Sequence, residues 1–383
     1  MKTTGNRIIK VFFLIVIIFV TLPSCKKGKI TPVDTNNPNP GGGVNNPYVP
    51  TEPYNPTNFY IPYSYLFLER LSPMQIPTDN PMTEEGVALG RKLFYDNILS
   101  GSNNMSCASC HNPQKAFSDS PNALTTVAGS STTRNSPAII NSGWATRLFF
   151  DGRATYPALE NQAYQPVTNP DEMHSLSWVE VVNKLSQTTD YPELFYKAFG
   201  IVTIDSTYVV KALAQFERTL ISDNSRMDKY LAGQGTLNAD ELAGLDLFLS
   251  EVGDCFHCHG GPGNPLWTDN NFYDIGLDPV YTDLGLGAIT GNPSDNGKFK
   301  VPTLRNLIFT GPYMHDGRFE TLEEVIEFYS TGINNTPNLD PNIAWRVNQG
   351  GANFTQEQKD QLLAFLKTLT DSTFINKPEF QAP

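Results

Sequence analysis

Two short stretches of this sequence combine two thiols with a histidine at the same spacing. The first reads Cys-Ala-Ser-Cys-His over residues 107–111, and the second reads Cys-Phe-His-Cys-His over residues 255–259. Thiols three positions apart can each add to a vinyl group of haem b, and the histidine that follows can then ligate the iron. The sequence therefore predicts two covalently attached c-type haems, held by Cys107, Cys110 and His111 and by Cys255, Cys258 and His259.

Other uses of paired cysteines fit these stretches less well. A structural zinc site needs its two pairs close together and has no need of the following histidines. A thioredoxin-like redox pair is typical of a βαβ pattern, which is absent. Two disulfides would leave both histidines unexplained. His257, inside the second stretch, is interpreted as a bystander and not a ligand.

Length and composition set broad limits on the fold. The 383 residues are enough for two domains of ordinary size. Only 39% of residues are hydrophobic, while Gly and Pro contribute 29 each, which indicates a loop-rich fold whose core includes the haems. The net charge of -12 argues against a nucleic-acid partner.

The N-terminus has the features of a targeting segment. Lys2, Arg7 and Lys10 precede an apolar run, and residues 22–25 read Leu-Pro-Ser-Cys, as in a lipoprotein box. A membrane-spanning helix needs about 20 apolar residues, more than this run offers. We expect residues 1–25 to be a lipoprotein signal peptide with its lipidated cysteine, Cys25. The protein is then lipid-anchored on the periplasmic side of a bacterial membrane, with the outer membrane as the first choice.

Residues 26–58 are dense in Pro, Asn and Gly and show no apolar periodicity, so they predict a disordered tether. Beyond them, apolar spacing predicts helices rather than sheets. One ends near residue 95, and others span residues 207–222, 321–329 and 355–370. Asn238 and Glu241 predict a capping box at the start of a helix through residue 249. Because a helix precedes each haem motif, we expect two related haem units that meet between residues 222 and 231.

Several further stretches resemble one family. They are Arg-Asn-Ser-Pro at 134–137, Asp-Gly-Arg at 151–153, Gln162 with Glu172 and Met173, Val-Pro-Thr-Leu-Arg-Asn at 301–306, Thr-Gly-Pro-Tyr-Met-His-Asp-Gly at 310–317 and Thr-Leu-Glu-Glu at 321–324. Over residues 59–369 the chain resembles the bacterial di-haem cytochrome c peroxidases, including the MauG-like enzyme that matures methylamine dehydrogenase.

That resemblance implies a mainly α fold with two cytochrome c-like haem domains, long loops and haems that face the domain interface. Residues 59–225 correspond to the N-terminal peroxidatic domain, and residues 226–383 to the C-terminal electron-transfer domain. Glu172 then corresponds to the acid/base that moves the peroxide proton, and Gln162 to its hydrogen-bonding companion. An isolated glutamate without the surrounding motif is usually a solvated surface residue.

The resemblance also implies a calcium ion between the haems. Its ligands correspond to the side-chain amide of Asn135 and the backbone carbonyls of Thr310 and Pro312, and oxygen-only ligation suits calcium. The alternative is that Asn135 only caps a turn before Pro137.

The sequence departs from the family at the N-terminal haem. Peroxidases carry a histidine shortly after the first motif that ligates the resting iron, but none occurs between His111 and His174. We therefore expect an open N-terminal iron, as in the maturation enzyme. His174 is an alternative ligand, or a residue of the pocket or the surface.

Two further departures concern electron transfer. Tyr329 stands where peroxidases place the Met ligand of the C-terminal haem, as in the maturation enzyme, and a phenolate favours oxidised iron. Met314 as the ligand, or Tyr329 as a packing residue, are the alternatives. Phe150 replaces the tryptophan between the haems and is hard to oxidise. Trp144 could compensate, although a core role fits it better.

The resemblance and these departures from it imply three alternative functions. The first is a peroxidase that reduces hydrogen peroxide to water at the N-terminal haem, with electrons relayed through the C-terminal haem from a small periplasmic cytochrome c or copper protein. The second is a MauG-like oxidase that uses peroxide to oxidise a protein or organic substrate. The third is a non-catalytic electron carrier. A homodimer is a further expectation from the family.

Overall fold

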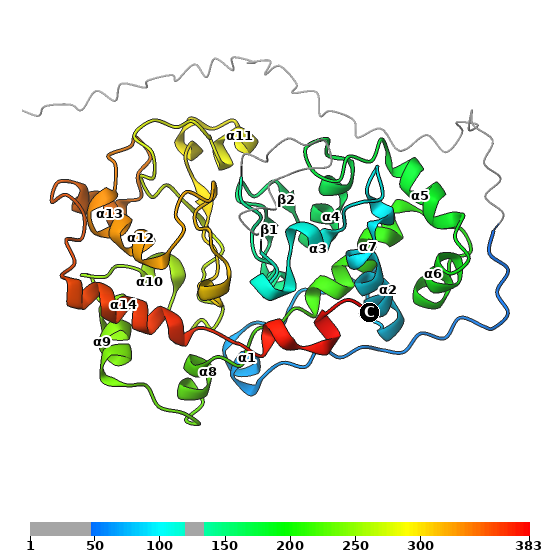
Figure 1. The fold of residues 1–383 in the computed structure, drawn as a ribbon, viewed down its shortest axis with the longest axis horizontal. Helices are drawn as coiled ribbons and strands as arrows, with labels where there is room; N and C mark the ends of the chain where they lie inside the picture. Colours follow the sequence, from blue (N-terminus) through cyan, green and yellow to red (C-terminus); the bar gives the residue numbers. More distant parts are fainter. Residues whose placement is uncertain (1–46, 119–133) are drawn as a thin grey trace, which may run out of the picture. The chain divides into compact units, whose positions relative to one another are not determined.

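The computed structural model describes residues 47–118 and 134–383 and is mainly helical (Figure 1). The helices of its first half are α1 (Tyr65–Arg70), α2 (Glu84–Tyr95), α3 (Cys107–Cys110), α4 (Ala158–Thr168), α5 (Trp178–Ser186), α6 (Tyr191–Phe199) and α7 (Ser206–Arg218). Those of its second half are α8 (Arg226–Leu231), α9 (Ala239–Phe248), α10 (Phe256–His259), α11 (Leu286–Thr290), α12 (Leu322–Glu327), α13 (Pro341–Val347) and α14 (Gln356–Thr368).

Within the described ranges, strands form only two short antiparallel pairs. Strand β1 (Arg147–Leu148) pairs with β2 (Ala154–Thr155), and β3 (Phe272–Tyr273) pairs with β4 (Phe299–Lys300). The mainly helical expectation is therefore confirmed. None of the helices in the described part of the chain is both long and apolar enough to cross a membrane.

Side-chain caps mark the starts of helices α2 and α9. The hydroxyl of Thr83 accepts a 3.0 Å hydrogen bond from the Gly86 N–H at the start of α2. Asn238 and Glu241 form the predicted capping box of α9, with bonds of 2.8 and 2.9 Å. These caps satisfy N–H groups that have no partner within the helix. One expected helix is shorter, because α12 ends at Glu327 and continues as a π-helical turn over Phe328–Gly332.

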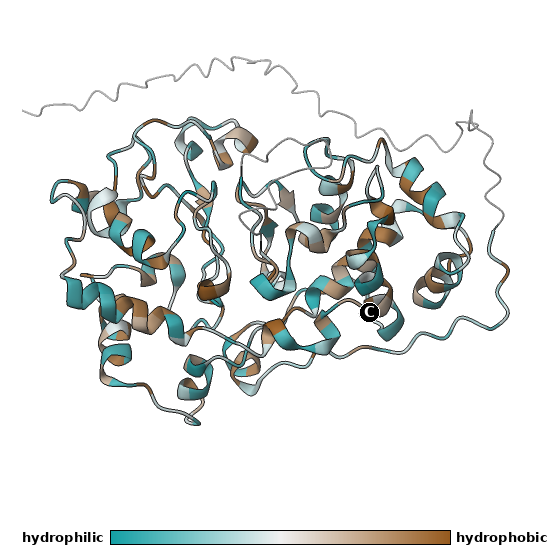
Figure 2. Cartoon of the chain, viewed as in Figure 1, coloured by the Kyte–Doolittle hydropathy of each residue, from teal (hydrophilic) through white to brown (hydrophobic). Residues whose placement is uncertain are grey.

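Two helix pairs organise the two halves. Helix α2 packs on α7, and α9 packs on α14, each around its own apolar cluster. Helices such as α5 and α14 carry both hydrophobic and hydrophilic residues (Figure 2), as expected for helices that cover a core. The predicted domain division after residue 225 stays a prediction.

The C-terminal residues return to the first half of the chain (Figure 1). Phe374 and Phe380 are buried in the cluster built around α2 and α7, and the Phe374 ring lies 5.7 Å from that of Phe117. The Arg91 guanidinium on α2 donates hydrogen bonds of 2.7 Å to the backbone oxygens of Pro378 and Gln381. The last residues therefore complete the first core.

The predicted signal peptide and Cys25 lie outside the described residues, as does the predicted tether up to residue 46. The remaining tether residues contact the folded part. The Tyr48 N–H donates to the Val202 carbonyl at 2.8 Å, and the Thr57 N–H donates to the Glu85 carboxylate at 2.9 Å.

Candidate functional site

Both cysteine motifs lie on one cavity of about 1150 Å³. Helix α3 contains both Cys107 and Cys110, and helix α10 contains Cys258 with Cys255 as its N-cap residue. In a helical turn, residues three positions apart lie on the same face. Burial raises the pKa of the Cys107 thiol, and it raises those of Cys255 and Cys258 to about 12. Cys107, Cys255 and Cys258 lie outside any disulfide.

The His111 ring is held by the backbone. Its Nδ1 lies 3.0 Å from the carbonyl oxygen of Phe117, which a left-handed turn at Ala116 and Phe117 brings back toward the motif. An Nδ1–H that donates to this carbonyl leaves Nε2 with its lone pair, which is the arrangement of a metal-ligating histidine. The buried Phe117 therefore fixes both the tautomer and the direction of His111.

His259 lies on the same cavity. Burial lowers its pKa to about 4, so the imidazole is neutral, as a ligand must be. Its buried Nδ1 has no hydrogen bond of good geometry among the described residues, although the backbone of Trp267 and Pro302 lies near the ring. His257 does not line this cavity and instead pairs with Asp254.

The cavity fits haem groups by size and by lining. Its volume exceeds the roughly 300–1,000 Å³ of a pocket for one small ligand. Apolar side chains from both halves face it, including Leu213, Phe248, Leu266, Ile326 and Leu362. Thiols for attachment, neutral imidazoles for the irons and apolar walls are the surroundings that a covalently bound haem requires.

Glu172 and Gln162 both line the cavity. Gln162 projects from α4, and Glu172 lies in the turn that follows this helix. Burial raises the Glu172 pKa, and a hydrogen bond opposes this rise. The donor is Asn169, whose Nδ2 lies 2.7 Å from Oε1, and no hydrogen bond joins Glu172 to Gln162 among the described side chains. Sequence reasoning missed Asn169, although its i,i+3 spacing from Glu172 was available.

The candidate ligands of the second iron also lie here. Tyr329 and Met314 line the cavity, and Tyr329 sits in the π-helical turn after α12. Burial raises the pKa of the Tyr329 phenol, and the nearby Cys258 and Cys255 thiols add to the rise. The phenol is therefore neutral unless a cation replaces its proton. His174 lies off the cavity, with its Nδ1 2.9 Å from the Pro170 carbonyl oxygen.

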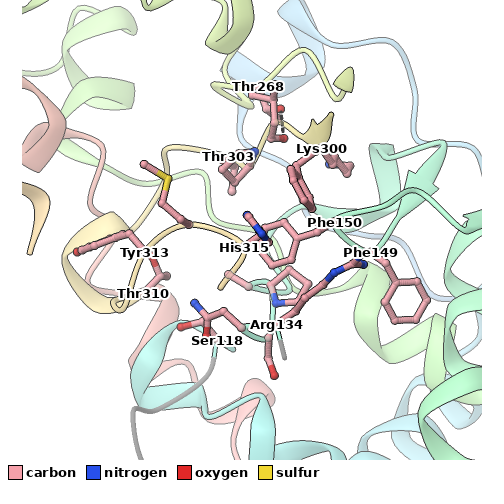
Figure 3. Close-up of a pocket in the computed structure, with 18 of the residues that line it drawn as sticks. Ser118, Arg134, Phe149, Phe150, Thr268, Lys300, Thr303, Thr310, Tyr313 and His315 are labelled. Atoms are coloured by element: carbon pink, nitrogen blue, oxygen red, sulfur yellow. Dashed lines mark hydrogen bonds between the residues drawn. The ribbon is translucent and has the colours of Figure 1, made fainter. Parts of the chain in front are cut away.

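Phe150 lines the cavity together with His315 and Arg134 (Figure 3). The Arg134 guanidinium bonds the Asp151 carboxylate at 2.6 Å and the Asp283 carboxylate at 2.7 and 2.8 Å. This arginine joins carboxylates from the two halves of the chain, a role that the sequence did not reveal.

The tryptophan that could compensate for Phe150 does not line this cavity. Trp144 donates from Nε1 to the Ser72 carbonyl at 2.9 Å and packs edge-on against Phe67. The predicted core role fits these contacts better than a role in electron transfer.

Asn135, Thr310 and Pro312 all line the cavity. The Asn135 Nδ2 lies 2.6 Å from the Pro312 carbonyl oxygen, and its backbone N–H donates to the His315 carbonyl at 2.7 Å. An amide and backbone carbonyls at this spacing offer the oxygen ligands that calcium prefers, once the amide oxygen faces the carbonyl.

The chain is similar to known proteins of one family. The family model described as di-haem cytochrome c peroxidase matches residues 84–236. The methylamine utilization protein MauG of Methylorubrum extorquens is 39% identical over 303 residues, 76% of this chain and 80% of that protein. The cytochrome c551 peroxidase of Nitrosomonas europaea is 34% identical over 324 residues, 82% of this chain and 87% of that protein.

A solved structure has a similar fold. The crystal structure of a MauG-like protein associated with microbial copper homeostasis superposes with a TM-score of 0.75 at 34% identity, over 84% of this chain and 99% of that one. The family implies haem c cofactors. The chain belongs to the di-haem cytochrome c peroxidase family, whose members include MauG, and is an oxidoreductase of the peroxidase type.

Proposed function

We propose that the protein reduces hydrogen peroxide to water at the haem held by Cys107, Cys110 and His111, with electrons relayed through the haem held by Cys255, Cys258 and His259. When bound, the haems supply redox-active iron that binds the peroxide and carries electrons from a small donor protein. The observation that supports this proposal best is the partly buried carboxyl of Glu172 on the cavity that His111 also lines.

The chain's own part in the reaction is proton transfer. Glu172 takes a proton from one oxygen of hydrogen peroxide and returns it to the other oxygen, which leaves as water. Because burial raises its pKa toward the working pH, the carboxyl can both accept and return this proton. Asn169 orients the carboxylate through Oε1, and Gln162 offers an amide at the same wall of the cavity.

Glu172→Gln tests this role, because it keeps the shape but cannot accept a proton. We expect kcat for peroxide with a reduced cytochrome or copper protein to fall about 10²- to 10⁴-fold. The matched control is Glu193→Gln on α6, whose half-exposed carboxylate pairs with Lys197 away from the cavity. A Glu172→Gln protein with unchanged turnover would contradict the proposal.

A second function is favoured by Tyr329. A phenolate ligand from this cavity-lining residue stabilises oxidised iron and suits a MauG-like oxidation of a protein or organic substrate. The two functions separate when peroxide is added to the fully oxidised protein and to the half-reduced protein. Reaction of the oxidised form without added electrons supports the oxidase, and reaction of only the half-reduced form supports the peroxidase.

We also propose that Asn135, Thr310 and Pro312 hold a calcium ion. The short distance between the Asn135 amide and the Pro312 carbonyl supports this proposal. Calorimetric titration of the chelator-treated protein should give one calcium site that Asn135→Ala loses. Asn161→Ala on α4, whose side chain does not line the cavity, should keep that site. If the unsubstituted protein and the Asn161→Ala protein both failed to bind calcium, the site would be ruled out. A lipid anchor at Cys25 and a periplasmic location complete the proposal.

A further inference from the structure

The two halves of the chain repeat the same helix crossing. A Cβ on Gly90 of α2 would lie 1.9 Å from the carbonyl oxygen of Ala212 on α7. A Cβ on Gly244 of α9 would lie 1.9 Å from the carbonyl oxygen of Gln361 on α14. Each crossing therefore depends on one glycine at the point where the helices touch. Ala212 and Gln361 therefore occupy equivalent positions in the two helix pairs.

Counting along both helices from this point aligns the residues that face the cofactor cavity. Four positions on, the Cβ atoms of Phe216 and Phe365 would lie 3.0 and 2.8 Å from a Cβ added to the crossing glycine of their own half. The next residues are Glu217 and Leu366, and both line the cavity. An acidic side chain thus occupies in the first half the position that an apolar one occupies in the second.

Contacts after the helices support the same alignment. The Asn141 N–H donates to the Leu220 carbonyl at 3.0 Å, and the Asn306 N–H donates to the Leu369 carbonyl at 3.2 Å. Leu220 and Leu369 each lie three residues beyond the aligned pair. The equivalence of Glu217 and Leu366 therefore rests on contacts both before and after them.

Glu217 lies in unusual surroundings for a carboxyl group. It is 5% exposed, and none of the described residues forms a hydrogen bond with its carboxyl. Three groups act on it electrostatically: Arg218 beside it on α7, Glu160 on α4 and the Cys107 thiol on α3. Arg218 is already bonded to Glu160 at 2.8 Å. Glu217 lines the cavity, and a carboxyl group in such a setting normally has a hydrogen-bond partner, because taking a charge out of water costs free energy.

We propose that Glu217 couples electron uptake by the haem of the first motif to proton uptake. In the one-electron step, a donor protein passes an electron to the ferric haem, and the Glu217 carboxylate binds a proton from solvent, so the charge at the site changes little. Glu217 acts as a tuning residue beside the cofactor. The proposal rests on haem attachment at Cys107 and Cys110 and does not require peroxide turnover.

The physical reason is the charge of the iron. Burial raises the Glu217 pKa to about 8, with Glu160 adding to the rise and Arg218 opposing it. A ferric haem carries one more positive charge than a ferrous haem, so it favours the ionised carboxylate and lowers this pKa. The Glu217 pKa is therefore lower beside the ferric haem than beside the ferrous haem. At a pH between these two values, Glu217 binds a proton when the haem is reduced. At Leu366 no such group exists, and the second haem lacks this source of coupling.

The test is the midpoint potential of each haem as a function of pH, measured by spectroelectrochemistry on the full-length di-haem protein. The first haem should become harder to reduce as pH rises through the neutral region. The steepest possible slope of the midpoint potential against pH corresponds to a tenfold change in the reduction equilibrium per pH unit, which is about 59 mV for one electron. Glu217→Gln and Glu217→Leu should lose most of this slope, and above pH 8 their first haem should have the more positive potential.

Leu366→Gln is the matched control at the equivalent position, and it should leave the slope of the first haem unchanged. Glu172→Gln tests whether the proton is bound by Glu172 instead, because its carboxyl also lines the cavity and also acts electrostatically on Cys107. A Glu217→Gln protein that carries both haems and keeps the wild-type slope would overturn the proposal. A slope lost in Glu172→Gln but kept in Glu217→Gln would assign the proton to Glu172 and overturn it as well.

Discussion

Asn169 donates a hydrogen bond of 2.7 Å to the Glu172 carboxylate, and this bond opposes the effect of burial on the acid/base residue. Activity that needs the carboxylate is lost as pH falls through its pKa. Asn169→Ala removes the donor, so the Glu172 pKa should rise further and the acid limb of the kcat profile should move to higher pH. The expected shift is roughly one to two pH units, because a hydrogen bond to a charged group contributes about 1.5–3 kcal/mol.

Asp171→Asn is the control of opposite sign. The Asp171 carboxylate raises the Glu172 pKa, so its neutralisation should move the acid limb to lower pH. Both profiles can be recorded with one reduced donor protein over the same pH range. If both substitutions moved the limb in one direction, Glu172 would not be the titrating group.

Tyr329 provides a spectroscopic prediction. Tyr329→Phe removes the hydroxyl from the cavity wall next to Cys258 and should change the absorption and electron paramagnetic resonance spectra of the second haem alone. Tyr313→Phe is the matched control, since Tyr313 also lines the cavity but donates its hydroxyl to the Leu307 carbonyl at 2.7 Å. Unchanged spectra in Tyr329→Phe would leave Tyr329 a packing residue.

Asp283 gives a pH-dependent prediction about stability. Burial disfavours its charge, but the Arg134 guanidinium and the Gly285 N–H outweigh burial and lower its pKa below the ordinary value. Its contribution to the free energy of unfolding is therefore present above the ordinary pKa of about 3.9 and is lost as pH falls through the lowered value. Asp283→Asn should reduce the free energy of unfolding by roughly 1–3 kcal/mol at pH 7 and by less near pH 3.

Denaturant titration at both pH values measures this difference. The control is Asp79→Asn, whose 72% exposed side chain pairs with Lys211 at 2.9 Å. Exposed ion pairs of this kind contribute roughly 0–1 kcal/mol. Equal losses in Asp283→Asn at pH 7 and pH 3 would show that its charge is not what stabilises the fold.

Phe374 links the end of the chain to the first haem motif. It packs on Phe117, whose carbonyl oxygen holds His111. Phe374→Ala should cost about 3–5 kcal/mol of unfolding free energy and should alter the spectrum of the first haem only. Phe354→Ala, in the cluster around α9 and α14, is the control and should affect the second haem instead. Perturbation of the second haem by Phe374→Ala would contradict this link.

The local features of the fold were predictable from the sequence. Thr83 and the pair Asn238 and Glu241 mark helix starts because a cap depends on residues three positions apart. The cysteine motifs were equally visible, since their chemistry is set by spacing alone. The cavity then brings His111, Glu172 and the other predicted site residues outside the leader together.

What the sequence could not reveal depends on contacts between distant residues. Arg134 reads as an ordinary charged residue until the fold brings Asp283 to it. Phe374 and Phe380 follow the last helix with no periodicity that tells which core they enter. Glu217 lies within a predicted helix and gives no signal of its own. Only its alignment with Leu366 shows that the equivalent position in the second half is apolar. The π-helical turn at Tyr329 was likewise not expected from the sequence, which predicted a continuous helix over residues 321–329.

The return of the last residues to the first core sets an order of events during synthesis. A chain is made from its N-terminus at about 5–20 residues per second, so roughly ten to fifty seconds pass between Phe117 and Phe374. During that time the wall behind His111 lacks Phe374 and Phe380. The first haem motif is therefore the earlier one to be made and the later one to be enclosed. A fragment that stops after α7 would keep Cys107, Cys110 and His111 but lack their final support.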